Sequence, residues 1–209
     1  NQNLLKQGRA LDKLYESLII GNGFGEPVSM NDMIVGDKSA IMIATRVLGY
    51  GADYEITLTH PETGKKFKHT ADLTKLKPKE VDLSIFNNSR EVEYKLPISQ
   101  KVIVFKIRTT EEEDKIAREV SRQEKAGISK PITTALKHCI VSIDGETDQK
   151  YINKFVDNDL LARDSLDLRK YILEITPDYD LSIHVDNKEH NFSQDIQLPI
   201  DVNFFWPRV

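Results

Sequence analysis

The fold class is set by residues 54–71, which read YEITLTHPETGKKFKHTA. Tyr54, Ile56 and Leu58 alternate with polar residues, as in a strand with one buried face. The PETG segment at 61–64 has the residue types of a tight turn, and residues 66–71 read as the returning strand. The stretch therefore predicts a β-hairpin over about 52–72.

Alternation of the same kind occurs near the C-terminus. Apolar and polar residues alternate over 181–185 and again over 196–200, which predicts a second β-hairpin at about 179–200. A further hairpin is expected in the middle of the chain, with its turn around Pro97 to Gln100.

Other apolar residues recur at the three- and four-residue spacing of amphipathic helices. A helix over Lys38 to Leu48 is expected to begin at an Asp37 N-cap and to be buried on more than one side. Thr110, followed three residues later by Glu113, predicts a capping box at the start of another helix. The predicted helical segments are 4–20, a short turn at 29–34, 38–48, 110–126, a helix beginning at Pro131, 148–158 and 162–175.

Together these elements predict an α+β fold, with a helical body and two β-hairpins. Hydrophobic residues make up 39% of the 209 residues and charged residues 30%, so the chain can form a real core. The predicted regions form one compact unit: an N-terminal helical region 1–51, a β-hairpin region 52–108, a helical region 109–178, and a C-terminal hairpin with an aromatic tail 179–209.

Composition narrows the function classes. The net charge of −4 and the pI of about 5.8 disfavour a nucleic-acid binder, which usually has a basic face. No apolar run approaches the ~20 residues that span a bilayer, and no signal peptide is visible, so no membrane partner is predicted. Cys139 is the single cysteine, so no internal disulfide can form. The chain begins at Asn1 without an initiator methionine, which indicates a longer or processed product.

The motifs of several enzyme classes are missing from the sequence. It has no phosphate-binding P-loop, nucleophile elbow, paired-histidine metalloprotease motif or zinc-deaminase motif. His138 and Cys139 are neighbours at the start of a predicted strand, 139–143, so their side chains should point to opposite faces. Cys139 is therefore expected to be a small buried hydrophobe rather than a nucleophile.

One predicted helix carries two carboxylates three residues apart. Asp164 and Asp167 would share a face and could hold a metal, but Arg163 and Arg169 lie beside them in the sequence. The arginines favour an ion-pair network at this place. No catalytic residue, metal or cofactor is predicted, and the chain is expected not to be an enzyme.

The segment Phe204-Phe205-Trp206-Pro207 is an apolar cluster near the C-terminus. Each aromatic side chain would bury on the order of 150 Å² or more when packed. Two interpretations stay open: the segment folds back into the core, or it docks into a partner. The second makes Phe204, Phe205, Trp206 and Pro207 the predicted partner-binding residues.

Several short blocks are recognisable along the chain. They are Gly8–Leu14 (GRALDKL), Met33–Ala44 (MIVGDKSAIMIA), Gly49–Gly51 (GYG), Ile143–Gly145 (IDG), Phe155, Ala162–Ser165 (ARDS) and Phe204–Pro207 (FFWP). With the order of the elements, these blocks resemble the T-even-type phage baseplate protein family, which includes a small baseplate hub subunit. The resemblance covers nearly the whole chain.

Many members of this family carry cysteine pairs in the two hairpins and are similar to zinc-ribbon proteins. The corresponding positions here are His60 and Thr63 in one turn, and Asn187 and His190 in the other. Structural zinc needs four Cys or His ligands as a rule, and this chain offers two. The resemblance therefore implies a degenerate, metal-free zinc-ribbon-like module in which the two hairpins pack near each other.

The resemblance implies a structural or assembly role in the baseplate hub of a contractile tail. The expected partners are other hub and tail proteins, including the tape-measure protein, and the expected location is the host cytoplasm during assembly or the virion baseplate. One alternative is a chaperone for the tape-measure protein that leaves the virion.

Two alternatives belong to other function classes. The first is a small hydrolase that uses Asp164 or His60. The second is a nucleic-acid adaptor that uses a basic stripe, formed by Lys65, Lys66, Lys68 and the lysines at 75–79.

Overall fold

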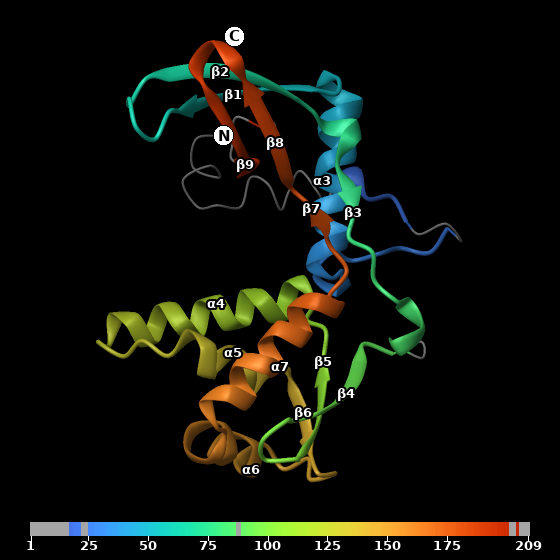
Figure 1. The fold of residues 1–209 in the computed structure, drawn as a ribbon. Helices are drawn as coiled ribbons and strands as arrows, with labels where there is room; N and C mark the ends of the chain where they lie inside the picture. The colour runs from blue at the N-terminus through green and yellow to red at the C-terminus, as the bar shows by residue number, and fades with distance from the viewer. Residues whose placement is uncertain (1–16, 22–24, 87–88, 201–203, 205–209) are drawn as a thin grey trace. The chain divides into compact units, whose positions relative to one another are not determined.

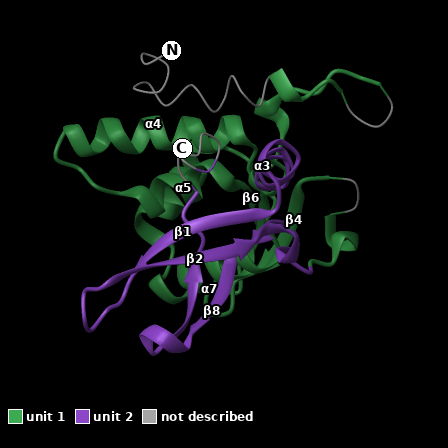
Figure 2. Ribbon diagram, turned by 90° about the horizontal axis from the view of Figure 1, so that it is seen from above, with its two compact units in different colours: residues 1–38, 81–176 green, residues 39–80, 177–209 purple. Residues whose placement is uncertain are grey.

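The computed structural model describes residues 17–21, 25–86, 89–200 and 204. These residues form two compact units rather than the expected single one (Figure 2). Unit 1 comprises the residues up to Lys38 together with Val81–Thr176, and unit 2 comprises Ser39–Glu80 together with the residues from Pro177 onward. Each unit therefore combines segments that are far apart in the sequence. The mixture of helices and strands makes the fold α+β, as predicted.

Unit 1 is built on a three-stranded antiparallel sheet in the order β4-β5-β6. The strands are β4 (Glu91–Lys95), β5 (Val102–Lys106) and β6 (Ile140–Ile143). The hairpin predicted around Pro97 to Gln100 is confirmed as the β4–β5 connection. Gln100 has a positive φ of 59° in its tight turn.

Helices cover this sheet and bury its apolar face (Figure 1). Leu136, Ile152 and Leu168 belong to three different helices, and all pack in one core with Phe105 of β5. The helices are α4 (Thr110–Lys125), α5 (Pro131–Cys139), α6 (Gln149–Lys154), a π-helical turn η4 (Phe155–Asp159) and α7 (Ala162–Ile175), with the 3-10 turns η1 (Met30–Asp32) and η3 (Leu83–Phe86).

The start of α4 lies one residue earlier than predicted. Thr109 is the N-cap, and its capping-box partner is Glu112, so the predicted pair of Thr110 and Glu113 is wrong by one position. The Glu112 carboxylate accepts the Thr109 N–H at 2.9 Å and forms ion pairs with Lys106 and Arg90. Partial burial raises the pKa of Glu112, but the hydrogen bonds from Lys106, Thr109 and Arg90 outweigh it and lower the pKa to about 2.

Unit 2 contains the two predicted hairpins, and both are confirmed. The strands are β1 (Asp53–Thr59), β2 (Lys66–Asp72), β8 (Ser182–Asn187) and β9 (Phe192–Gln197), with a short β3 (Lys77–Pro78) paired to β7 (Tyr179–Asp180), and with the 3-10 turns η2 (Leu73–Lys75) and η5 (Lys188–His190). Phe67 of the first hairpin shares a small core with Val185 and Phe192 of the second. The prediction that the hairpins pack near each other is therefore confirmed.

The helix α3 (Val35–Tyr50) contributes residues to both units and begins three residues before the predicted start. Asp37 is not its N-cap, because it lies inside the first turn and accepts the Ile34 N–H at 3.3 Å. The expectation of burial on several sides is wrong: Met42 and Ile43 are buried, but Leu48 is 87% exposed.

The remaining sequence predictions have mixed outcomes. The turn predicted at 29–34 is confirmed as η1. Of the helix predicted at 4–20, only Ser17 and Leu18 are described as helical, and residues 1–16 lie outside the described residues. No helix in the described ranges is long and apolar enough to cross a bilayer.

The depressed pKa of Glu112 makes the stability of unit 1 pH-dependent. A carboxylate whose pKa is lower when folded stabilises the fold above its ordinary pKa of 4.5, and this stabilisation is lost as the pH falls toward about 2. We expect Glu112→Gln to lower the unfolding free energy by about 1–2 kcal/mol at pH 7, after allowance for partial exposure. Urea unfolding from pH 2 to pH 7 measures this difference.

The matched control is Glu93→Gln, which changes an exposed carboxylate on β4. It should leave the unfolding free energy nearly unchanged. A destabilisation by Glu112→Gln that is equal at pH 2 and pH 7 would contradict the assignment.

Candidate functional site

The C-terminal aromatic cluster is described only at Phe204. This side chain is fully buried, and its ring packs edge-on against Tyr54, with the ring centroids 5.0 Å apart. The Tyr54 hydroxyl donates a hydrogen bond to the Pro199 carbonyl at 2.8 Å. Phe204 thus belongs to the core in this conformation and is not accessible for docking, whereas Phe205, Trp206 and Pro207 lie outside the described residues.

The turn of the first hairpin is closed by His60. Its Nδ1 accepts the N–H groups of Glu62 at 3.2 Å and Thr63 at 3.3 Å, and its ring is buried. The Thr63 hydroxyl accepts the Lys65 N–H at 3.4 Å. The His60 side chain therefore points at the backbone of its own turn and holds that turn instead of facing solvent.

The turn of the second hairpin is closed in a similar way. The Asn187 side-chain oxygen accepts the His190 N–H at 3.2 Å, and Asn191 then adopts a left-handed conformation. The His190 ring stacks on Phe67 of the first hairpin, with centroids 4.9 Å apart. In return, His60 of the first hairpin lies edge-on to Phe192 of the second at 6.0 Å. The two histidines therefore join the hairpins through aromatic contacts.

The described part of the chain offers no group of three or more His, Cys, Asp or Glu side chains that could hold a metal ion. His60 and Asn187 instead direct their acceptor atoms at the backbone of their own turns. The four ribbon positions thus come together in one unit, and each has a role in closing a turn or packing the hairpins.

The predicted strand 139–143 is confirmed as β6, but it begins one residue later, at Ile140, because His138 and Cys139 end the helix α5. Cys139 is buried, as expected, and its thiol contacts the Leu136 carbonyl at 3.5 Å. Burial raises the pKa of this thiol to about 11, so it stays protonated near neutral pH. His138 points away to α4, where its Nε2 lies 2.8 Å from a Glu119 carboxylate oxygen.

Asp164 is fully buried and is not part of an exposed ion-pair network, so that expectation is wrong. Its carboxylate accepts the N–H groups of Ile98 at 2.8 Å and Ser99 at 2.9 Å in the β4–β5 turn. Burial raises the pKa of Asp164, but these hydrogen bonds outweigh it and lower the pKa. The carboxylate fixes α7 to the hairpin, and leaving the two N–H groups unpaired would cost on the order of 1–3 kcal/mol each.

A Ser-His-Asp line lies on the second hairpin, and the sequence reasoning missed it. His184 Nδ1 is 2.8 Å from an Asp195 carboxylate oxygen, and its Nε2 is 3.4 Å from the Ser193 hydroxyl. The line forms because His184 pairs directly with Asp195 across the strands, while Ser193 lies two residues away on the same face. The His184 and Asp195 side chains are 61% and 78% exposed, so water surrounds the line.

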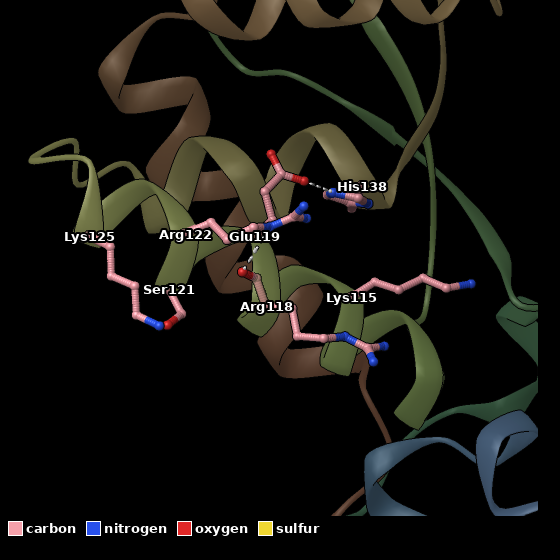
Figure 3. A pocket seen from close by; sticks show the side chains of 7 residues that line it. All are labelled: Lys115, Arg118, Glu119, Ser121, Arg122, Lys125 and His138. Carbon is pink, nitrogen blue, oxygen red and sulfur yellow. Dashed lines mark hydrogen bonds and ion pairs between the residues drawn. The ribbon is translucent and has the colours of Figure 1, made fainter.

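The helix α4 borders an open depression of about 630 Å³ that the sequence reasoning also missed (Figure 3). Its lining is mostly cationic: Lys115, Arg118, Arg122 and Lys125, with Ser121, Glu119 and His138 of α5. The basic residues recur at spacings of three, four and three, so they lie along one helix face. The spacing can be read from the sequence, but acidic residues lie between the basic ones, so the segment does not stand out as basic.

The comparisons with known proteins found no match. No family model matches this chain, and neither a search of curated proteins nor a search of solved structures found a similar protein.

Proposed function

We propose that this chain is a non-enzymatic structural or assembly protein of a contractile phage tail. It acts in baseplate hub assembly through contacts with other hub and tail proteins, including the tape-measure protein. The support comes from the sequence blocks that resemble the baseplate family, and from the use of Cys139, Asp164 and His60 to hold the fold. Assembly takes place in the host cytoplasm, and the chain either stays in the baseplate or leaves as a tape-measure chaperone.

The outward face of α7 is the observation that carries the proposal. Leu166 and Leu173 are seven residues apart, so they lie on one face of the helix, and they are 42% and 73% exposed. Asp164, Leu168 and Ile175 are buried on the other side. Covering a fully exposed leucine contributes about 1.5–3 kcal/mol, so a partner that covers part of this face gains binding energy.

The paired hairpins are the metal-free zinc-ribbon-like module of this proposal. Small two-stranded hairpins are marginally stable alone. Here the crossed contacts of His60 with Phe192 and of His190 with Phe67 supply packing between the turns where a metal would otherwise join them. The module thus acts as a rigid support and not as a metal centre.

A co-expression pull-down tests the assembly role. The bait is the whole chain, the prey are the hub and tape-measure proteins of the same phage, and the variant is Leu166→Glu with Leu173→Glu. We expect the wild-type chain to capture at least one of these proteins, and the variant to capture it at least about tenfold less, because two charges would be buried at the contact.

The matched control is Leu48→Glu with Leu83→Glu, which changes two leucines that are 87% and 66% exposed. It adds the same charge on other surfaces and should capture as well as wild type. Thermal melts of both variants check that they fold. Failure of the wild-type chain to capture any hub or tape-measure protein contradicts the proposal, as does equal loss in the two variants.

A second candidate, a small hydrolase, is favoured by the Ser193–His184–Asp195 line alone. The contact between Ser193 and His184 is long, at 3.4 Å, and the His184 and Asp195 side chains are exposed to water. The serine is therefore poorly activated as a nucleophile. We expect a fluorophosphonate probe to label wild type no more than Ser193→Ala, and the two to hydrolyse p-nitrophenyl acetate at equal rates. Labelling that Ser193→Ala abolishes would favour the hydrolase and overturn the non-enzymatic assignment.

A further inference from the structure

The cationic face of α4 is a stripe that runs from Lys115 to Lys125. It consists of Lys115, Arg118, Arg122 and Lys125, which span about 15 Å along a helix that rises 1.5 Å per residue. All four of these cationic side chains are exposed. Figure 3 shows these side chains extending from α4, while His138 reaches the same depression from α5.

Most of this positive charge is not neutralised within the described part of the chain. Lys115 pairs with Glu111 at 2.9 Å. The Nε atoms of Arg118 and Arg122 donate to backbone carbonyls one turn earlier, which orients the side chains but cancels no charge. Among the residues that the structure describes, Arg118, Arg122 and Lys125 form no ion pair with an acidic side chain.

The one carboxylate in the lining is already engaged. Glu119 contacts His138 through one oxygen at 2.8 Å and accepts from the Gln123 amide through the other at 3.1 Å. It lies at the edge of the stripe, on the side toward α5. The depression is therefore positively charged along α4, with a single internal anion at one side.

We infer that this depression binds an acidic α-helical segment of another protein. Carboxylates on a helix at spacings of three, four and three repeat at the same intervals as the four cations of α4, so they can face them one by one. The methylene stems of the arginines and lysines provide apolar surface for side chains between those carboxylates. This inference is independent of the tail-assembly proposal, because it rests on the charge and spacing of α4.

The lining favours a protein over a nucleic acid. A phosphodiester backbone would have to pass the Glu119 carboxylate, whereas separate carboxylates on a helix can lie to one side of it. Among the residues that the structure describes, the lining contains no Phe, Tyr or Trp on which a base could stack, and its one imidazole, His138, is engaged by Glu119.

Fluorescence anisotropy with a synthetic probe tests the inference. The probe is a labelled alanine-rich helical peptide with four glutamates at spacings of three, four and three, and its control has the same composition with the glutamates spread around the helix. We expect the whole chain to bind the probe more tightly than the control peptide, with an affinity that falls as salt rises.

Two charge-reversed variants make the test specific. Arg118→Glu with Arg122→Glu should weaken binding of the probe by at least about tenfold. The matched control, Lys150→Glu with Lys154→Glu, reverses two exposed charges four residues apart on α6 and should change the affinity less than about twofold.

Three outcomes would overturn the inference. The first is no binding of the probe at low salt. The second is equal binding of the two peptides, or equal loss in the two variants, because either indicates general attraction between charges. The third is tighter binding of a single-stranded oligonucleotide of the same charge, lost in Arg118→Glu with Arg122→Glu, which would assign the face to nucleic acid.

Discussion

The carboxylate of Glu112 joins three separate segments of unit 1. It completes the capping box of α4, pairs with Lys106 at the end of β5, and pairs with Arg90 just before β4. Arg90 also donates to the Ile107 carbonyl at 2.7 Å. The two carboxylate oxygens of Glu112 accept from Lys106, Arg90 and the Thr109 N–H. These contacts fix the direction in which α4 leaves the sheet. The position of α5, and therefore of the depression beside α4, depends on that direction.

Buried polar groups elsewhere in the chain also hold backbone segments in place. Asp164 uses both carboxylate oxygens on the backbone of one turn, and His60 uses Nδ1 on another. A group in this situation loses its hydrogen bonds if it takes up a proton or turns to a substrate. The residues that first look like catalytic candidates are thus the supports of the fold.

The hairpins and most helices could be predicted because their patterns are local. The capping box could not be placed, since Thr109 and Thr110 are each followed three residues later by a glutamate. The choice depends on the extended backbone of Thr109, which is bridged to Ile34 far away in the sequence. Which residues of α7 are buried could not be predicted either. The N–H groups of the β4–β5 turn need a hydrogen-bond acceptor, so Asp164 faces inward and Leu166 faces outward.

The candidate sites were harder to predict than the fold. The line of Ser193, His184 and Asp195 depends on the register of two strands, and sequence alternation does not give register. The stripe on α4 is visible as spacing, but only the structure places His138 and Glu119 beside it. By contrast, the closeness of the two hairpins followed from the family resemblance and is confirmed by their shared core.

We propose that this chain assembles a contractile tail by contact and not by catalysis. The most direct measurement is electron microscopy of particles from a phage in which an amber mutation stops synthesis of this chain. The account predicts filled heads without baseplates or tails, and rescue by a plasmid copy carrying Ser193→Ala but not by one carrying Leu166→Glu with Leu173→Glu. Normal tails in the amber phage, or rescue that requires Ser193, would contradict it.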